Sequence, residues 1–144
     1  MLYLLAGKYD ILTQQGYFYW QGEYMQKTIF VVDDNGTNLS MAEEALEDQY
    51  RVITLVSAAK MFTILEKVVP DLILLDIEMP EMDGFEAIQQ LKAGAHANIP
   101  VIFMTATADA ANESRGKELG AVDFITKPFS PPVLLDVIKK YVAE

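Results

Sequence analysis

The chain has no cysteine, no apolar segment long enough to cross a membrane, and no cluster of Lys or Arg. Without cysteine, disulfide bonds, thiolate metal sites and cysteine nucleophiles are all excluded, and the chain suits a reducing cytoplasm. No stretch approaches the roughly 20 apolar residues that span a bilayer. The N-terminus also lacks the basic flank and long apolar run of a signal peptide. We therefore expect a soluble, cytoplasmic protein.

The 144 residues carry a formal net charge of −10, and this acidic balance limits the partners of the protein. An acidic surface repels nucleic acid and anionic membranes, so we expect the partners to be proteins. Solubility alone is the simpler explanation for most of the charge. With 51% hydrophobic residues, the chain can bury the core of one ordinary domain.

From Thr28 onward, short apolar segments alternate with longer segments of helical period. The short segments predict five strands: Ile29 to Asp33, Val52 to Val56, Leu72 to Asp76, Val101 to Thr105 and Val122 to Ile125. The longer segments predict five helices, around residues 39–46, 58–68, 85–91, 110–119 and 134–141. Ser57 and Asp109 are expected to cap the second and fourth helices, and the fourth is the weakest because Gly116 lies inside it.

This alternation predicts an α/β fold, because strands without polar alternation need helices on both faces of a parallel sheet. Right-handed crossovers then give a doubly wound (βα)5, flavodoxin-like three-layer sandwich. We expect the sheet order 2-1-3-4-5, which is common in this fold class. We expect this domain to cover residues 28–144. In such sheets, sites lie at the carboxyl ends of the strands.

The first 27 residues do not follow the alternation and are predicted to be an atypical, aromatic-rich extension. They hold seven of the chain's 15 aromatic residues: Tyr3, Tyr9, Tyr17, Phe18, Tyr19, Trp20 and Tyr24. We expect a short hairpin or an arm that joins two subunits into a homodimer, because exposed aromatic residues otherwise promote aggregation. Since Met25 stands where a domain could begin translation, an upstream extension or a misassigned start remains an alternative.

Five polar residues follow or end the predicted strands: Asp33, Asp34, Asp76, Thr105 and Lys127. The first and third strands are neighbours in the order 2-1-3-4-5, so these side chains should converge on one crevice. Three carboxylates in one crevice repel each other and would bind a hard cation, for which Mg²⁺ is well suited.

The same residues predict phosphoryl transfer to a carboxylate. Because Mg²⁺ needs only one or two protein carboxylates, Asp76 can act as the nucleophile beside the bound ion. Lys127 would neutralise the phosphoryl oxygens, and the Thr105 hydroxyl would donate a hydrogen bond to one of them.

Four motifs, in order, resemble the signature set of bacterial response-regulator receiver domains of the chemotaxis-regulator type. They are VVDDN at 31–35, LLDIEMPEMDG at 74–84, Thr-Ala at 105–106 and Lys-Pro-Phe at 127–129. The resemblance covers about residues 27–143 and implies a domain of two-component signal transduction. Such a domain is not an enzyme, although it assists its own Mg²⁺-dependent phosphorylation and dephosphorylation.

The resemblance also implies the roles of individual residues. Asp76 would receive its phosphoryl group from a histidine kinase or a histidine phosphotransfer protein. Asp34, Asp76 and the backbone carbonyl of Glu78 would bind Mg²⁺ directly, with Asp33 reaching it largely through water. Lys127 would contact the phosphate, and its bond to Pro128 is expected to be cis.

Thr105 and Phe124 would form a switch that alters a protein-binding surface on the fourth helix, fifth strand and fifth helix, toward a downstream protein target. Phe124 departs from the commoner pattern, which has Tyr at this position. Glu78 and Thr107 occupy the positions that tune dephosphorylation in the family.

Other interpretations remain for each residue alone. Asp33 and Asp34 could form a turn or a helix cap, and Asp76 could cap a helix. Thr105 could bond to backbone, and Lys127 could be a solvated surface charge. An aspartyl phosphohydrolase fits less well, because such enzymes usually place a second Asp two residues after the nucleophile, where this chain has Glu78. A structural adaptor would be free to lose Asp76 or Lys127.

The single histidine, His96, is read as solvated rather than as a phosphate acceptor. The cognate kinase, the output partner, the phosphoryl lifetime and the oligomeric state stay open, as does whether the domain stands alone or belongs to a larger protein.

Overall fold

A computed structural model describes residues 26–107 and 109–143, so the predicted N-terminal extension lies almost wholly outside the described residues. The strands in this part of the chain are β1 (Thr28–Val32), β2 (Arg51–Leu55), β3 (Leu72–Asp76), β4 (Val101–Thr105) and β5 (Asp123–Thr126). All four pairings are parallel, and the strand order is β2-β1-β3-β4-β5. The predicted sheet order is therefore confirmed.

Three strands are each displaced by one residue along the sequence from their predicted positions. β1 ends at Val32 instead of Asp33, β2 ends at Leu55, and β5 runs from Asp123 to Thr126. The sheet pairing still reaches Asp33, whose amide donates to the Leu55 carbonyl at 3.0 Å. Apolar runs predict which part of a strand is buried. The end of the strand is set by the last backbone amide that pairs with a carbonyl of the neighbouring strand.

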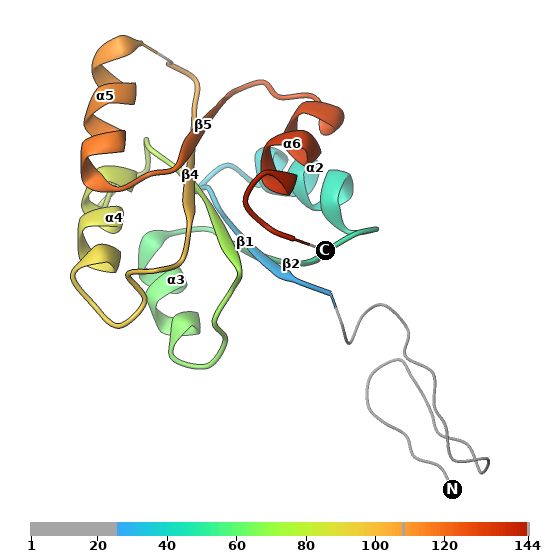
Figure 1. The fold of residues 1–144 in the computed structure, drawn as a ribbon, viewed down its shortest axis with the longest axis horizontal. Coiled ribbons are helices and arrows are strands. Elements are labelled where there is room, and N and C mark those ends of the chain that lie inside the picture. Colours follow the sequence, from blue (N-terminus) through green and yellow to red (C-terminus); the bar gives the residue numbers. More distant parts are fainter. Residues whose placement is uncertain (1–25, 108, 144) are drawn as a thin grey trace, which may run out of the picture.

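The helices cover both faces of the sheet, as a doubly wound fold requires. They are α2 (Gly36–Leu46), α3 (Ala58–Leu65), α4 (Gly84–Lys92), α5 (Ala110–Leu119) and α6 (Pro131–Lys139). α2 and α6 lie on one face, and α3, α4 and α5 lie on the other (Figure 1). The predicted three-layer architecture is confirmed.

Each helix begins at a polar residue whose side chain accepts a hydrogen bond from an amide of the first turn. The N-caps are Asn35, Ser57, Asp83, Asp109 and Ser130. The predicted caps at Ser57 and Asp109 are confirmed. Such caps satisfy amides that have no partner within the helix, and so fix where each helix starts.

The core has two layers, one on each face of the sheet. Along β1, Phe30 and Val32 pack toward α3 and α4, while Ile29 and Val31 pack toward α2 and α6. All four side chains are fully buried, and so are those of the central strand β3 except at its carboxyl end. The two apolar layers pack closely on both faces of the sheet, and the polar residues Asp33, Asp76 and Thr105 lie at its carboxyl edge.

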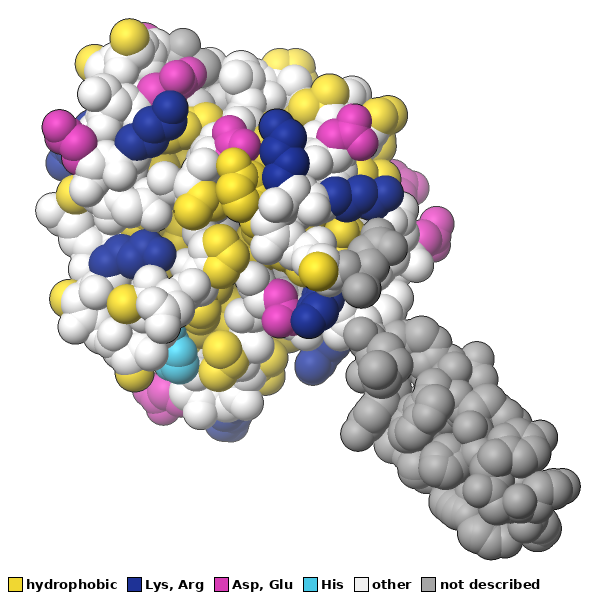
Figure 2. Space-filling model, viewed as in Figure 1, with side chains coloured by type: hydrophobic (Ala, Val, Ile, Leu, Met, Phe, Trp, Pro, Cys, Tyr) yellow, Lys and Arg dark blue, Asp and Glu magenta, His cyan; other side chains and the backbone are white. Residues whose placement is uncertain are grey.

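The surface carries scattered charges. On the face in Figure 2, the Lys and Arg side chains lie among Asp and Glu and do not form one continuous basic patch. His96 is half-buried in the segment after α4. Within residues 26–107 and 109–143, no helix is both long and apolar enough to cross a membrane.

Candidate functional site

Two buried aspartates lie side by side at the carboxyl edge of the sheet. Asp33 follows β1 and Asp76 ends β3, and these strands are neighbours. Asp33 is fully buried and Asp76 is 2% exposed, whereas the adjacent Asp34 is exposed. One carboxylate oxygen from each of the three lies within 4.8 Å of the others. The crevice predicted from the strand order therefore brings all three carboxylates together.

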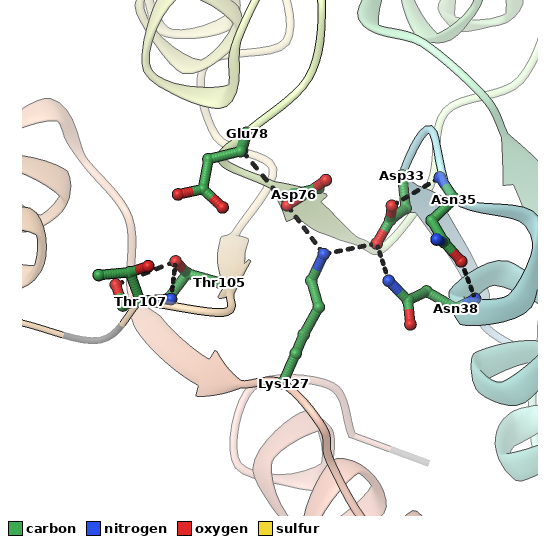
Figure 3. A network of polar contacts seen from close by, with 8 residues as sticks. All are labelled: Asp33, Asn35, Asn38, Asp76, Glu78, Thr105, Thr107 and Lys127. Carbon is green, nitrogen blue, oxygen red and sulfur yellow. Dashed lines mark hydrogen bonds and ion pairs between the residues drawn. The ribbon is translucent and has the colours of Figure 1, made fainter.

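The turn between β1 and α2 fixes the orientation of Asp33 (Figure 3). The Asn35 amide donates to Asp33 Oδ1 at 2.9 Å, and the Asn38 side chain donates to Asp33 Oδ2 at 3.2 Å. Asn35 in turn caps α2 by accepting from the Asn38 amide at 3.0 Å. The prediction missed both asparagines, although the spacing Asp33, Asn35, Asn38 is typical of a side-chain-capped turn before a helix.

Lys127 joins the two buried aspartates. Its Nζ lies 2.9 Å from Asp33 Oδ2 and 3.0 Å from Asp76 Oδ1. The Lys127 amide donates to the Thr105 carbonyl at 2.8 Å, and the Lys127–Pro128 bond is cis, as the resemblance implies. One ammonium group therefore joins Asp33 and Asp76, which lie 94 and 51 positions before Lys127 in the sequence.

The charges at this edge shift each other's protonation. Burial raises the pKa of Asp76 to about 6; hydrogen bonds from Lys127 and from the Glu78 amide oppose this rise, and the charge of Asp33 adds to it. Burial acts to lower the pKa of Lys127, but its bonds to Asp33 and Asp76 outweigh burial and raise it. An ammonium group that stays charged therefore faces a carboxylate that resists ionisation.

Thr105 lies at the end of β4 but its hydroxyl turns toward its own loop. It donates to the Thr107 carbonyl and accepts from the Thr107 amide, both at 3.0 Å. Figure 3 shows this pair to the side of the Lys127 bridge. The exposed Glu78 contributes its amide, which donates to Asp76 Oδ1 at 3.3 Å. Thr105 is thus present at the predicted edge, and its hydroxyl is engaged by Thr107.

Gly84 packs against the end of the Asp76 strand, a contact that the prediction missed. A Cβ at Gly84 would lie 2.5 Å from the Asp76 carbonyl oxygen and 2.8 Å from the Ile77 Cα. The Gly84 amide donates to the Ile77 carbonyl at 2.7 Å. From the sequence, Gly84 is interpreted as part of a turn into the helix, whereas the structure shows that only a residue without a side chain lets α4 start this close to β3.

The donor set fits a hard divalent cation. Three carboxylates supply oxygen ligands within reach of one ion, and one of them is exposed, so that waters can complete the coordination. Part of their charge is already balanced by Lys127. The site suits an ion that binds few protein ligands and keeps several waters, as Mg²⁺ does.

The comparisons with known proteins agree with this geometry. The family model of the response regulator receiver domain matches residues 29–139. The polar-differentiation response regulator DivK of Brucella ovis is 34% identical over 122 residues, which are 83% of this chain and 99% of DivK. A probable cyclic di-GMP phosphodiesterase of Vibrio cholerae is 44% identical over 110 residues, 76% of this chain.

Several of these relatives are longer proteins. The chain spans only 25% of the phosphodiesterase, and 46% of a probable transcriptional regulator, ycf27, of Cyanophora paradoxa.

Solved structures show the same fold. The chemotaxis protein CheY4 of Vibrio cholerae has a TM-score of 0.78 at 26% identity, over 81% of this chain and 99% of CheY4. The BeF3-activated receiver domain of DrrB, from Thermotoga maritima, has a TM-score of 0.76 at 29% identity, over 83% of this chain and all of that domain. The chain therefore belongs to the response regulator receiver domain family and is a signalling domain of two-component systems.

Proposed function

We propose that Asp76 is the residue of this receiver domain that accepts the phosphoryl group, beside a Mg²⁺ ion held by the acidic cluster. The observation that carries the proposal is the Lys127 bridge, which holds Asp33 and Asp76 at 2.9 and 3.0 Å from one ammonium group. This arrangement leaves Asp34 exposed beside them. One of the three carboxylates can therefore react while the others serve the ion.

Each residue then has a distinct role in the transfer. Asp76 attacks phosphorus, so that an oxygen–phosphorus bond forms while the nitrogen–phosphorus bond of a donor phosphohistidine breaks and the imidazole leaves. Lys127 stabilises the negative charge of the phosphoryl oxygens. Thr105 and Phe124 form the switch: the hydroxyl leaves Thr107 and donates to a phosphoryl oxygen, and the ring of Phe124 moves with it.

Mg²⁺ would be held by Asp34, Asp76 and the Glu78 carbonyl, with Asp33 acting largely through water. When bound, the ion neutralises oxygens of the transferring group. The Asn35 and Asn38 hydrogen bonds to Asp33 support this role, since they fix a carboxylate at the rim of the metal site.

The phosphoryl donor is proposed to be a histidine kinase or a histidine phosphotransfer protein, docked on the groove between α2 and α6. A cavity of about 330 Å³ opens there, lined by Met41, Glu44, Ala45, Phe129 and Pro131. Both helices begin directly after site loops, α2 after Asp33 and α6 after Lys127. A donor helix in this groove would therefore hold its histidine close to Asp76.

The output surface is proposed to be α5, β5 and α6, which would bind a downstream protein target. Among the strands that the structure describes, β5 pairs with β4 alone, and it lies between these helices (Figure 1). Hydrophobic side chains reach the surface in the middle of this face (Figure 2), and Val122, Val133 and Tyr141 are among the exposed large apolar residues. An apolar strip beside a polar rim is typical of a protein-binding surface.

The remaining assignments are also part of the proposal. The receiver domain covers residues 28–144, residues 1–27 form a separate extension that can join two subunits, and the domain acts in the cytoplasm. It assists its own Mg²⁺-dependent phosphorylation and dephosphorylation without turning over a substrate.

The proposal is tested by incubating the full chain with Mg²⁺ and acetyl phosphate and measuring phosphoryl incorporation by intact mass. We expect the wild type to gain one alkali-labile, hydroxylamine-sensitive phosphoryl group and Asp76→Asn to gain none. Lys127→Ala should lower the rate on the order of 10²-fold, as loss of one charge-stabilising group does elsewhere. Asp83→Asn is the matched control, because Asn keeps the N-cap of α4.

Equal labelling of Asp76→Asn and the wild type would refute the assignment of Asp76. Rapid turnover of a small phosphomonoester, at many cycles per minute, would favour the phosphohydrolase alternative. EDTA should stop incorporation in the wild type, and restored Mg²⁺ should bring it back, since the carboxylate cluster needs its ion.

A further inference from the structure

α5 is held on the domain by very few apolar contacts of its own. Gly116 is its only buried residue, and Leu119 is partly buried. The other positions of its sequence, AANESRGKEL, are mostly small or charged and at least partly exposed. A helix without an apolar face gains little from packing, so specific contacts must decide where it lies.

Gly116 receives an aromatic ring from β5. A Cβ at Gly116 would lie 2.4 Å from Cζ of Phe124 and 3.0 Å from Cδ2 of Phe103. No real Cβ comes this close to a ring carbon, so the missing side chain is what admits Phe124. Gly116 lowers the helix propensity of α5, but its missing side chain leaves a notch in the helix surface that the Phe124 ring of β5 occupies.

Phe124 is the end of a row of three rings that crosses this side of the core. Its centroid lies 5.6 Å from that of Phe103, which lies 5.5 Å from that of Phe85 in an edge-to-face arrangement. The guanidinium of Arg115 lies 4.3 Å from the centre of the Phe85 ring. Two consecutive residues of α5 therefore contact the two ends of the row, Arg115 at Phe85 and Gly116 at Phe124.

The same row touches the backbone of the acidic site. Cε1 of Phe103 would lie 3.0 Å from a Cβ at Gly84, the glycine that also packs on the Asp76 carbonyl. Because these groups are closely packed, a movement of the rings would displace the backbone at the end of β3, and a movement of the Asp76 backbone would displace the rings.

We propose that Gly116 is a positioning residue that holds Phe124 in its packed place and thereby seats α5 in the unphosphorylated protein. A side chain at 116 displaces the ring, releases α5 and brings the domain toward its phosphorylated conformation. The first half of this inference concerns the notch alone. The second half rests on the proposed function, because it couples the notch to phosphorylation of Asp76.

The test compares the wild type with Gly116→Ala in the absence of phosphoryl donor and metal. In the wild type, nuclear Overhauser contacts should join the Phe124 ring to the Gly116 α-protons. In Gly116→Ala, the ring resonances of Phe124 should shift, and amide exchange of α5 should accelerate at least tenfold relative to that of α4. Gly36→Ala is the matched control, because a Cβ on this helical glycine meets no atom within 4 Å.

A second variant separates the contact from a general loss of folding. Phe124→Ala removes the closest contact of a Cβ at position 116 and leaves the 3.0 Å contact with Phe103, so adding Gly116→Ala to it should accelerate exchange in α5 far less than Gly116→Ala does alone. This loss of the effect is what a contact between Gly116 and Phe124 predicts and what a general defect in α5 does not.

The coupling is read from acetyl phosphate labelling with Mg²⁺. Gly116→Ala should label Asp76 roughly fivefold faster than the wild type, within the range of ordinary coupling between two sites, and Gly36→Ala should label at the wild-type rate. Unchanged Phe124 resonances in Gly116→Ala would overturn the notch. A displaced ring with an unchanged labelling rate would overturn the coupling. Absence of labelling in the wild type would refute the proposed function and leave the notch to be decided by the resonances.

Discussion

α4 and α5 lie on the same face of the sheet but are held there in opposite ways. α4 buries Phe85, Ala87, Ile88 and Leu91, and a capping box between Asp83 and Glu86 closes its first turn. In α5, only Gly116 is buried. One helix is fixed by its own apolar face and the other by rings that belong to its neighbours.

The difference follows the chemistry at the sheet edge. α4 begins against the strand that ends in Asp76, and a moving helix there would disturb the proposed acceptor. α5 follows the strand that ends in Thr105, whose hydroxyl must change partners in the proposed switch. The helix beside the proposed acceptor is thus held by its own buried side chains, and we expect the helix beside the proposed switch hydroxyl to be released at small cost.

The largest expected effect is on α4. Ile88→Ala removes a fully buried side chain and should lower the free energy of unfolding by about 2 to 5 kcal/mol. Leu119→Ala, in α5, should lower it by less than about 1.5 kcal/mol, because Leu119 is only partly buried. Urea denaturation followed by circular dichroism measures both, and similar losses in the two variants would contradict the comparison.

The charge of Asp76 should lower the stability of the whole domain. Its pKa is about 6 in the folded protein against 3.8 as the ordinary value, so the folded state binds a proton that the unfolded state releases between these pH values. Stability contributed by this group therefore falls as pH rises from about 4 to about 6, by on the order of 2 to 3 kcal/mol in total. Without metal, Asp76→Asn should be more stable than the wild type at pH 7.5, and the gap should shrink near pH 4.

Hydrogen exchange then separates the two helices. Amides of α4, which open with the whole domain, should gain protection in Asp76→Asn, whereas amides of α5, which open locally, should not. Mg²⁺ should close the gap at pH 7.5 by stabilising the wild type. A gap that stays constant from pH 7.5 to pH 4 would show that the charge of Asp76 is not its cause.

The smallest expected effect concerns the N-caps. Asp83→Ala should cost about 1 kcal/mol of global stability, because α4 unfolds with the domain. Asp109→Ala should instead accelerate exchange in the first turn of α5 and leave the urea midpoint almost unchanged. The Asp→Asn variant at each position keeps the cap and should behave as the wild type. A clear drop of the urea midpoint in Asp109→Ala would mean that α5 is not held separately.

The sequence was sufficient to predict the doubly wound fold, because apolar runs alternate with helical segments, and to predict the convergence of the acidic residues, because they stand at the ends of those runs. The strand order 2-1-3-4-5 came from the fold class, for which it is a common order. The boundaries of β1 and β5 differ by one residue, since Asp33 forms a turn with Asn35 and Thr126 still pairs with Thr105. The capping box at Asp83 was readable from its spacing to Glu86 but was not used.

Two features could not be predicted from local patterns. Gly116 looks like a defect in a weak helix until Phe124, eight residues later on β5, is placed against it in space. The Thr105 hydroxyl bonds to both the carbonyl and the amide of Thr107, and this pairing depends on the path of the loop after β4. Both depend on tertiary contacts that spacing along the chain does not encode.

The close approach of Gly84 to the Asp76 carbonyl also matters for protein engineering. Because the start of α4 touches the strand that ends in Asp76, inserting a fluorescent domain or a binding peptide between β3 and α4 would displace Asp76 directly. α5 is linked to Asp76 less directly, through the rings of Phe124 and Phe103. A reporter that should follow the state of this receiver therefore belongs beside α5, at a position that leaves the contact between Gly116 and Phe124 intact.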